Sequence, residues 1–370
     1  MFIFYKIFLL IVAATLASSL KNQAFTQSKP AKPIRKSGLR VEPVPSKRLV
    51  NIWINNHLFT SYRYSDEIMK PVLWPIYASQ NVAVTRGFPI SPKAGERIDH
   101  PHHVGLWFNH GDVNNHDFWN NSLQIGKEHS GPFGKIVHTR INNYHSGPTK
   151  GDLVVHSEWL DKEGKVLIDE KTIFLFESMG AIRSITRIAE LKARTDTVRF
   201  KDNKEGLLGL RVARFLEHPS NKPEQFIDKN GQVTDVPILN NFGVTGMYSN
   251  SEGITGEQVW GKRAKWMNLK GFSGKDSTGI ILFDHPSNPG FPTHWHARGY
   301  GLFSANGLGA RVFSEGKEHL DLVLLPGETK QFSYKMYIWS QTVPSNDFIN
   351  KLYSEWEEMN SETLLKLNDY

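Results

Sequence analysis

Short segments in which apolar and polar residues alternate recur along most of the chain. Successive side chains of a β-strand point to opposite faces, so one face of segment 153–160 carries Leu153, Val155, Ser157 and Trp159. Similar segments, separated by turn-forming Gly, Asn, Asp and Pro, predict strands at 49–54, 82–85, 105–108, 135–141, 153–160, 171–176, 182–190, 209–214, 279–283, 301–305, 319–325 and 331–339. Strands this numerous, at a spacing of about ten residues, predict an all-β fold of two large packed sheets.

The C-terminal segment 345–367 has helical periodicity instead. Apolar residues recur there every three or four positions, at Phe348, Leu352, Trp356 and Met359. Ser345 or Asn346 can cap the first turn. We therefore expect a C-terminal helix that covers one of the sheets.

The N-terminal segment 1–27 has the pattern of a secretory signal, in which a lysine and an apolar stretch of about ten residues precede small and polar residues. A bilayer span needs about 20 apolar residues, and no cysteine follows for lipid attachment. Segment 28–46 is rich in proline and basic residues, which predicts a solvated linker. We expect an exported protein, periplasmic or secreted, with one β-sandwich domain over 47–370 and no membrane span once the signal is removed.

Composition narrows the expected partners. The absence of cysteine excludes disulfides and thiolate metal sites. Lys and Arg number 44 against 37 Asp and Glu, which gives a formal net charge of +7. The basic residues form no long block and no nucleic-acid motif occurs, so we expect no nucleic-acid partner. The charge favours an anionic small molecule or polysaccharide, and the sequence does not define an oligomeric state.

Five of the fifteen histidines fall within segment 99–119. Read as one regular strand, 102–110 places His103, Gly105, Trp107 and Asn109 on one face. The other, core-facing side then carries His102, Val104, Leu106, Phe108 and His110. A histidine and a tryptophan beside a glycine gap suit the apolar face of a sugar ring.

Metal binding is an alternative interpretation of the same segment. His100 and His102 are spaced as a ligand pair, and Asp99 or Asp112 would add a hard oxygen ligand. A divalent metal ion is therefore a possible cofactor, and no other cofactor is expected. Individual histidines of the segment can also be core residues that hold turns together.

A second polar cluster lies at 284–300. Strand alternation places His294, His296, Arg298 and Tyr300 on one surface. Arginine is rarely buried unpaired, and its fork fits a carboxylate. The alternative is an exposed strand end with structural ion pairs. Arg211, Arg214 and the basic segment 260–266 form a third set, which can bind an anion or form structural ion pairs.

Several strings of the chain together resemble the bacterial "PmoA-like" family. They lie at 70–75, 86–89, 96–114, 117–119, 259–266 and 288–303. The resemblance implies exported carbohydrate-utilisation proteins with a galactose-mutarotase-like β-supersandwich. It also implies similarity to ulvan-oligosaccharide dehydratases, which eliminate water from a terminal uronic acid and leave a 4,5-unsaturated sugar.

Such an elimination needs a cation for the carboxylate, a base for the C5 proton and an acid for the C4 hydroxyl. We assign carboxylate binding to Arg298, helped by Arg86. His103 and His296 are the expected bases, and Tyr300 or His110 is the expected acid. The remaining expected substrate contacts are Trp107, Trp295, His294 and Asn109. A sugar epimerase or mutarotase and a non-catalytic glycan-binding module are the alternative functions.

Overall fold

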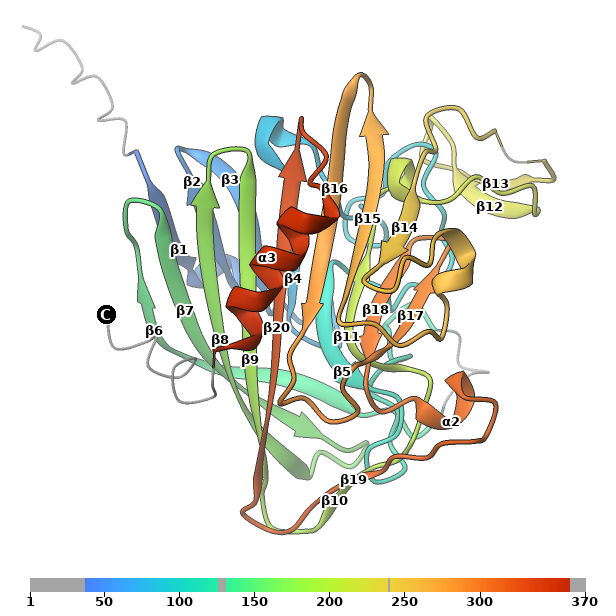
Figure 1. Ribbon diagram of the computed structural model, residues 1–370. Coiled ribbons are helices and arrows are strands. Elements are labelled where there is room, and N and C mark those ends of the chain that lie inside the picture. Colours follow the sequence, from blue (N-terminus) through green and yellow to red (C-terminus); the bar gives the residue numbers. More distant parts are fainter. Residues whose placement is uncertain (1–36, 126–130, 239, 360–370) are drawn as a thin grey trace, which may run out of the picture. The chain divides into compact units, whose positions relative to one another are not determined.

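The computed structural model describes residues 37–125, 131–238 and 240–359, which form two large antiparallel sheets (Figure 1). The order of the first sheet is β1 (Leu39–Val44), β2 (Leu49–Ile54), β3 (His57–Arg63), β4 (Val72–Ile76), β5 (Leu106–His110), β11 (Gly206–Arg211), β18 (Leu302–Asn306) and β17 (His294–Arg298). The order of the second is β14 (Met247–Asn250), β15 (Trp266–Ser273), β16 (Asp276–Asp284), β20 (Thr329–Ser340), β9 (Ile182–Ala193), β8 (Val166–Met179), β7 (Lys150–Leu160) and β6 (Lys135–His145). The predicted all-β class with two large sheets is confirmed.

Two small two-stranded sheets complete the strands. β10 (Val198–Phe200) pairs with β19 (Leu322–Leu324), and β12 (Glu224–Ile227) pairs with β13 (Val233–Val236). Short 3-10 helices lie at Pro45–Lys47, Ser79–Asn81, Arg214–Leu216 and Gly256–Val259. A single-turn helix, α2, covers Ala310–Phe313.

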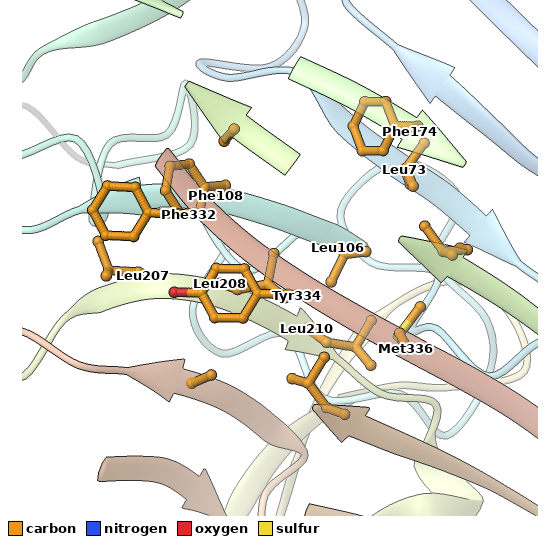
Figure 2. Packing of buried hydrophobic residues seen from close by; sticks show 14 of the residues in the cluster. Leu73, Leu106, Phe108, Phe174, Leu207, Leu208, Leu210, Phe332, Tyr334 and Met336 are labelled. Atoms are coloured by element: carbon orange, nitrogen blue, oxygen red, sulfur yellow. The ribbon is translucent and has the colours of Figure 1, made fainter. Parts of the chain in front are cut away.

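The main core lies between the two large sheets. Leu106 and Phe108 of β5 enter it from the first sheet, and Phe332 and Tyr334 of β20 enter it from the second (Figure 2). The rings of Phe108 and Phe332 lie 5.4 Å apart. The predicted alternation in segment 153–160 is confirmed, because Leu153, Val155 and Trp159 join this core while Val154 packs on the opposite face of the sheet.

Helix α3 (Asn346–Glu357) packs on that opposite face of the second sheet (Figure 1). The expected cap is present, since the Ser345 hydroxyl accepts a hydrogen bond from the Phe348 amide at 3.2 Å. The expected apolar stripe is confirmed in part: Trp356 is buried, and Leu352 and Met359 pack against the same cluster. Phe348 is exposed instead, and Ile349 and Tyr353 are buried. The helix ends at Glu357 instead of continuing to 367, and residues 360–370 lie outside the described part.

Several strands of the structure lie outside the segments predicted from the sequence. Segment 39–44 belongs to the expected linker, yet it forms β1 and pairs along its whole length with β2. Leu39 and Val41 are buried there, so the folded domain begins before residue 47. Segment 82–85 makes only isolated bridges instead of a strand. The expected signal, 1–27, and the linker residues 28–36 lie outside the described residues.

Among the described residues, none of the helices combines the length and apolar character needed to cross a bilayer.

We predict that Trp356→Ala lowers the free energy of unfolding by about 3–5 kcal/mol, because it leaves a cavity between α3 and the sheet. The Trp356 ring is 1% exposed and its Nε1 donates to the Asp284 carbonyl at 3.1 Å. The control Phe348→Ala on the same helix should change stability by no more than about 0.5 kcal/mol, since Phe348 is 41% exposed. Equal losses in urea unfolding would contradict this packing.

Candidate active site

Gly105 interrupts the strand that the sequence predicts through the first histidine cluster. Its φ of +57° is in the left-handed region, and a Cβ there would lie 2.3 Å from the Leu73 carbonyl oxygen. β5 therefore starts at Leu106, and the preceding histidines lie in a loop. The rings of His102 and His103 are 4.4 Å apart, so the expected placement of these two residues on opposite faces is wrong.

Four aromatic rings lie nearly parallel on the outer face of the first sheet. The His100 ring lies 4.8 Å from His103 and 5.1 Å from Tyr300, with interplanar angles of 3° in both pairs. The His103 ring lies 5.2 Å from Trp107 at 16°. This arrangement brings residues of the first histidine cluster against Tyr300 of the second.

The carboxylate of Asp99 holds the loop that carries these histidines. Its Oδ1 accepts from Arg86 Nη1 at 2.8 Å and from Arg211 Nη2 at 2.6 Å. Its Oδ2 lies 2.6 Å from His100 Nδ1. Burial opposes ionisation, but Arg211, His100 and Arg86 keep the pKa of Asp99 below its usual range. Asp99 is therefore a fixed anion whose two oxygens orient three cationic or donor groups.

Arg86 is a structural residue, which corrects the expected substrate contact. Its side chain is 1% exposed. Besides the Asp99 carboxylate, its two terminal nitrogens bond the backbone of the loop. They donate to the backbone carbonyl oxygens of Asp99, His100 and His103 at 2.8, 2.9 and 3.2 Å. These hydrogen bonds to the loop leave the guanidinium unavailable to a substrate.

His100 lines a cleft. Its Nδ1 donates to Asp99, and its Nε2 has no hydrogen-bond partner among the described residues. The side chain is 40% exposed, and the residue has a left-handed φ of +46°. Strained backbone of this kind at a non-glycine residue is often a feature of functional sites.

The cleft has a volume of about 400 Å³ and a wall of mixed charge. It is bounded by loops around 97–100, 218–224, 257–260 and 297–300, and its polar and aromatic lining includes Arg97, Asp99, His100, His218, Glu224, Glu257, Trp260, Arg298 and Tyr300. Arg97 is buried and committed to Glu217 and Glu224, at 2.8 and 2.9 Å.

Arg298 is one of two exposed basic residues that line the cleft, and Lys222 is the other. Its guanidinium carbon lies 5.5 Å from the Trp260 ring centroid and 5.9 Å from that of Tyr300. Within the described residues it forms no ion pair with a carboxylate. Burial raises the pKa of Tyr300 to about 12, although Arg211 and Arg298 oppose the rise. The phenol is therefore protonated at neutral pH.

The two expected bases do not line this cleft. His103 is 2% exposed, and its Nδ1 lies 3.2 Å from Arg211 Nη1. His296 is buried against Phe313, and its Nδ1 donates to the Lys204 carbonyl at 3.1 Å. Burial, with the charges of Lys204 and Arg298, lowers the pKa of His296 to about 3. Burial also lowers the pKa of His103 well below its usual value. Both rings are neutral packing groups in this structure.

Five further expected site residues are buried away from the cleft. His110 Nε2 donates to the Lys201 carbonyl at 2.7 Å, and the Asn109 amide donates to the Phe118 carbonyl. His294 Nδ1 donates to the Gly261 carbonyl at 2.8 Å. Trp295 lies in the main core and Trp107 lies beneath His103, both fully buried. The expectations that His110 is an acid and that the other four contact substrate are therefore corrected.

The structure does not assemble the expected metal ligands. Asp112 follows the C-terminal end of β5, whereas His100 and His102 precede its start. Asp112 instead accepts from the Asn115 amide at 3.0 Å. Within the described residues, the group with metal-like spacing is His116, Asp161 and Glu163 on the surface.

Trp260 and Glu257 are cleft residues that the sequence did not predict. Trp260 begins the basic segment 260–266, one of the candidate anion-binding segments, so a signal for it was present. Arg211, from the same third set, is fully buried under Tyr300 with its guanidinium carbon 4.9 Å from the ring centroid. It forms a structural ion pair, as the alternative interpretation of that set stated.

Residues 49–354 match the family DUF6807, described as a family of unknown function. The chain belongs to this family. No curated protein matches its sequence.

Several solved structures are similar in part. A GH36 α-galactosidase, AgaB of Geobacillus stearothermophilus, aligns with a TM-score of 0.39 and 10% identity over 82% of this chain and 41% of that chain. A putative aldose 1-epimerase from Escherichia coli K12 aligns with a TM-score of 0.33 and 10% identity over 82% of this chain and 99% of that chain. A galactose mutarotase-like protein of Lactobacillus casei aligns with a TM-score of 0.27 and 10% identity, over 81% of this chain and 100% of that chain. The chain thus spans about two fifths of the length of the galactosidase.

We predict that Arg86→Met lowers the free energy of unfolding by about 3–5 kcal/mol, since it leaves the carboxylate of Asp99 partly unpaired in a buried position. Arg298→Met removes an exposed guanidinium and should change stability by no more than about 0.5 kcal/mol. Urea unfolding of the two variants measures the difference. A stable Arg86→Met protein would show that the loop does not depend on this pair.

Proposed function

We propose that the protein is an enzyme that eliminates water from a terminal uronic acid of an anionic oligosaccharide and releases a 4,5-unsaturated uronate. The observation that carries the proposal is that His100, Tyr300 and Arg298 line one cleft. They supply the base, the acid and the cation that this elimination requires. The net positive charge of the chain is in keeping with an anionic substrate.

Arg298 binds the substrate carboxylate in this proposal. An exposed guanidinium beside Tyr300, without a carboxylate partner among the described residues, can form two parallel hydrogen bonds to a uronate. Trp260, beneath the guanidinium, fixes its plane through a cation–π contact. Neutralising the carboxylate also stabilises the charge that develops when the adjacent C5 proton is removed.

His100 and Tyr300 transfer the two protons. His100 Nε2 takes the proton from C5, while Asp99 stabilises the imidazolium that forms through its bond to Nδ1. The electron pair of the C5–H bond forms the C4=C5 double bond as the C4–O bond breaks. Tyr300 donates its phenolic proton to the departing hydroxyl, which leaves as water. Proton return from His100 to Tyr300 through solvent restores both groups.

The closeness of the two rings favours a particular stereochemistry. Because the His100 and Tyr300 rings lie 5.1 Å apart and nearly parallel, the base and the acid reach the same face of the sugar. The elimination would then be syn. A D-glucuronate, in which H5 and the C4 hydroxyl are cis, fits this arrangement better than its C5 epimer, L-iduronate.

We expect wild-type protein and glucuronate-terminated oligosaccharides to produce the ultraviolet absorbance of a conjugated enol ether. His100→Ala and Tyr300→Phe should each lower kcat by about 10²–10⁴-fold, the usual contribution of a positioned acid or base. His57→Ala, an exposed histidine on β3, is the matched control and should retain the wild-type rate.

Three results would contradict this assignment. Full activity of both variants would remove His100 and Tyr300 from the reaction. Interconversion of anomers without an unsaturated product would identify an epimerase or mutarotase. Binding of oligosaccharide with no conversion would identify a glycan-binding module.

We also predict that Arg298→Gln raises KM for uronate substrates by about 10- to 100-fold, the value of a charge-assisted hydrogen bond. The effect should vanish for binding of an analogue whose carboxylate is reduced to an alcohol, because that analogue has no charge for Arg298 to bind. The analogue lacks the carboxylate that activates C5–H, so it is tested as a competitive inhibitor, and its inhibition constant should be the same for wild type and variant. An equal loss of affinity for substrate and inhibitor would show that Arg298 does not recognise the carboxylate.

A further inference from the structure

A second cavity, of about 200 Å³, lies beside the histidine loop. Pro101, His102 and Val104 line it, whereas the neighbouring His100 lines the cleft. Lys70 and segment 121–124 form other parts of its wall. Neighbouring residues of one loop therefore line two different cavities.

Lys70 is an unusual residue for such a wall. Its side chain is 4% exposed, and its Nζ donates to the Trp119 carbonyl at 3.1 Å. The ammonium also lies 5.6 Å from the Trp107 ring centroid. No ion pair joins it to a carboxylate of the described residues. Burial lowers the pKa of Lys70 to about 7, and Asp117 opposes that shift. Two N–H groups of the ammonium thus have no acceptor in the described part of the chain.

His102 adds a second buried group without a partner. It is 8% exposed, and its Nε2 makes no hydrogen bond within the described residues. Burial, followed by the positive charges of Lys70, His100, Arg211 and Arg86, keeps the pKa of His102 well below its usual value. Its neutral ring carries one N–H donor.

Further buried donors near this cavity lack an acceptor among the described residues. The indole Nε1 atoms of Trp107 and Trp119, in the same buried cluster, also have no acceptor in the described part of the chain. Two acidic residues are nearby. Asp117 is occupied by the backbone amides of Trp119 and Asn120, and Glu67 is exposed at the cavity wall. Buried donors are normally satisfied, so a ligand that brings acceptors fits this site.

We propose that the second cavity binds a small oxyanion, such as sulfate, phosphate or a carboxylate, with Lys70 as its counter-ion and His102 as a hydrogen-bond donor. The volume suits a group of this size. The buried Arg86 and Arg211 add a positive background around His102. The site is separate from the carboxylate contact assigned to Arg298.

Titration of the full chain with sodium sulfate, against sodium chloride at equal ionic strength, tests this site. We expect saturable binding in calorimetry, tighter at about pH 6 than at about pH 8 because protonated Lys70 attracts the anion. Lys70→Met should weaken sulfate binding at least about tenfold. Lys47→Met, an exposed lysine, is the matched control and should bind like wild type.

Two further variants keep the test decisive. Arg298→Gln should leave the Lys70-dependent component of sulfate binding unchanged, since that residue lies in the cleft. If Lys70→Met does not fold, Leu123→Trp narrows the cavity at a residue that is 62% exposed and leaves Lys70 in place. This variant should also weaken binding. If a uronate monosaccharide displaces sulfate, the natural ligand of the cavity is an anionic group on a sugar. If the monosaccharide does not displace sulfate, the natural ligand is a free ion.

The proposal is overturned if wild type shows no saturable sulfate binding, in which case the cavity holds only water. It is also overturned if Lys70→Met and Leu123→Trp both bind like wild type. Loss of binding in Arg298→Gln alone would place the anion in the cleft. Failure of the dehydration assay leaves these results unaffected, because sulfate binding is measured without turnover.

Discussion

The carboxylate of Asp99 is the contact on which the outer face of the first sheet depends. Two buried guanidinium groups, Arg86 and Arg211, share its Oδ1. Burial, and then the charge of Arg211, lowers the pKa of Arg86 to about 9. Without the carboxylate, two like charges would be desolvated side by side, which is far more costly than a paired buried ion. Asp99 makes their proximity possible.

The same two arginines also fix the position of the histidine loop relative to the first sheet. The Arg211 amide donates to the Gly105 carbonyl at 3.0 Å, and the Arg86 amide donates to the Arg211 carbonyl at 3.1 Å. Backbone and side chains of the same two arginines thus hold both ends of the histidine loop. His100 can keep a left-handed backbone because the contacts around it compensate for the strain. The result is an imidazole fixed on one side and open on the other.

Local sequence patterns correctly predicted features that depend on neighbouring residues in the chain, such as the faces of a strand and the start of a helix. Alternation predicted which residues of β7 face the core, and Ser345 was recognisable as a helix cap. The same alternation failed at Gly105, because the rule assumes a regular strand and the left-handed glycine ends it. β1 was missed although Leu39 and Val41 alternate with charged residues, since proline and basic residues around it resemble a linker.

The site was less predictable because burial is a property of tertiary contacts. Arg86, Arg211 and Arg298 are the same residue type, and their sequence neighbours do not show which of them is buried. Only the fold shows that the first two surround Asp99 and that the third faces the cleft. In the same way, His103 and His296 have the chemistry of a base but lie behind the groups that reach solvent. The second polar cluster was nonetheless placed correctly beside the first through Tyr300 and His100.

One charge imbalance links the two cavities of this face. Asp99 supplies a single negative charge to two arginines, so positive potential remains after the pairing. That potential adds to burial, the larger cause, in lowering the pKa of His102 and His103, and Arg211 and Arg298 oppose the rise in the pKa of Tyr300. Under the two proposals above, each cavity binds an anion. The cationic core that holds the loop in place would then also adapt the face to carboxylates and other oxyanions, and structural and recognition roles would rest on the same buried groups.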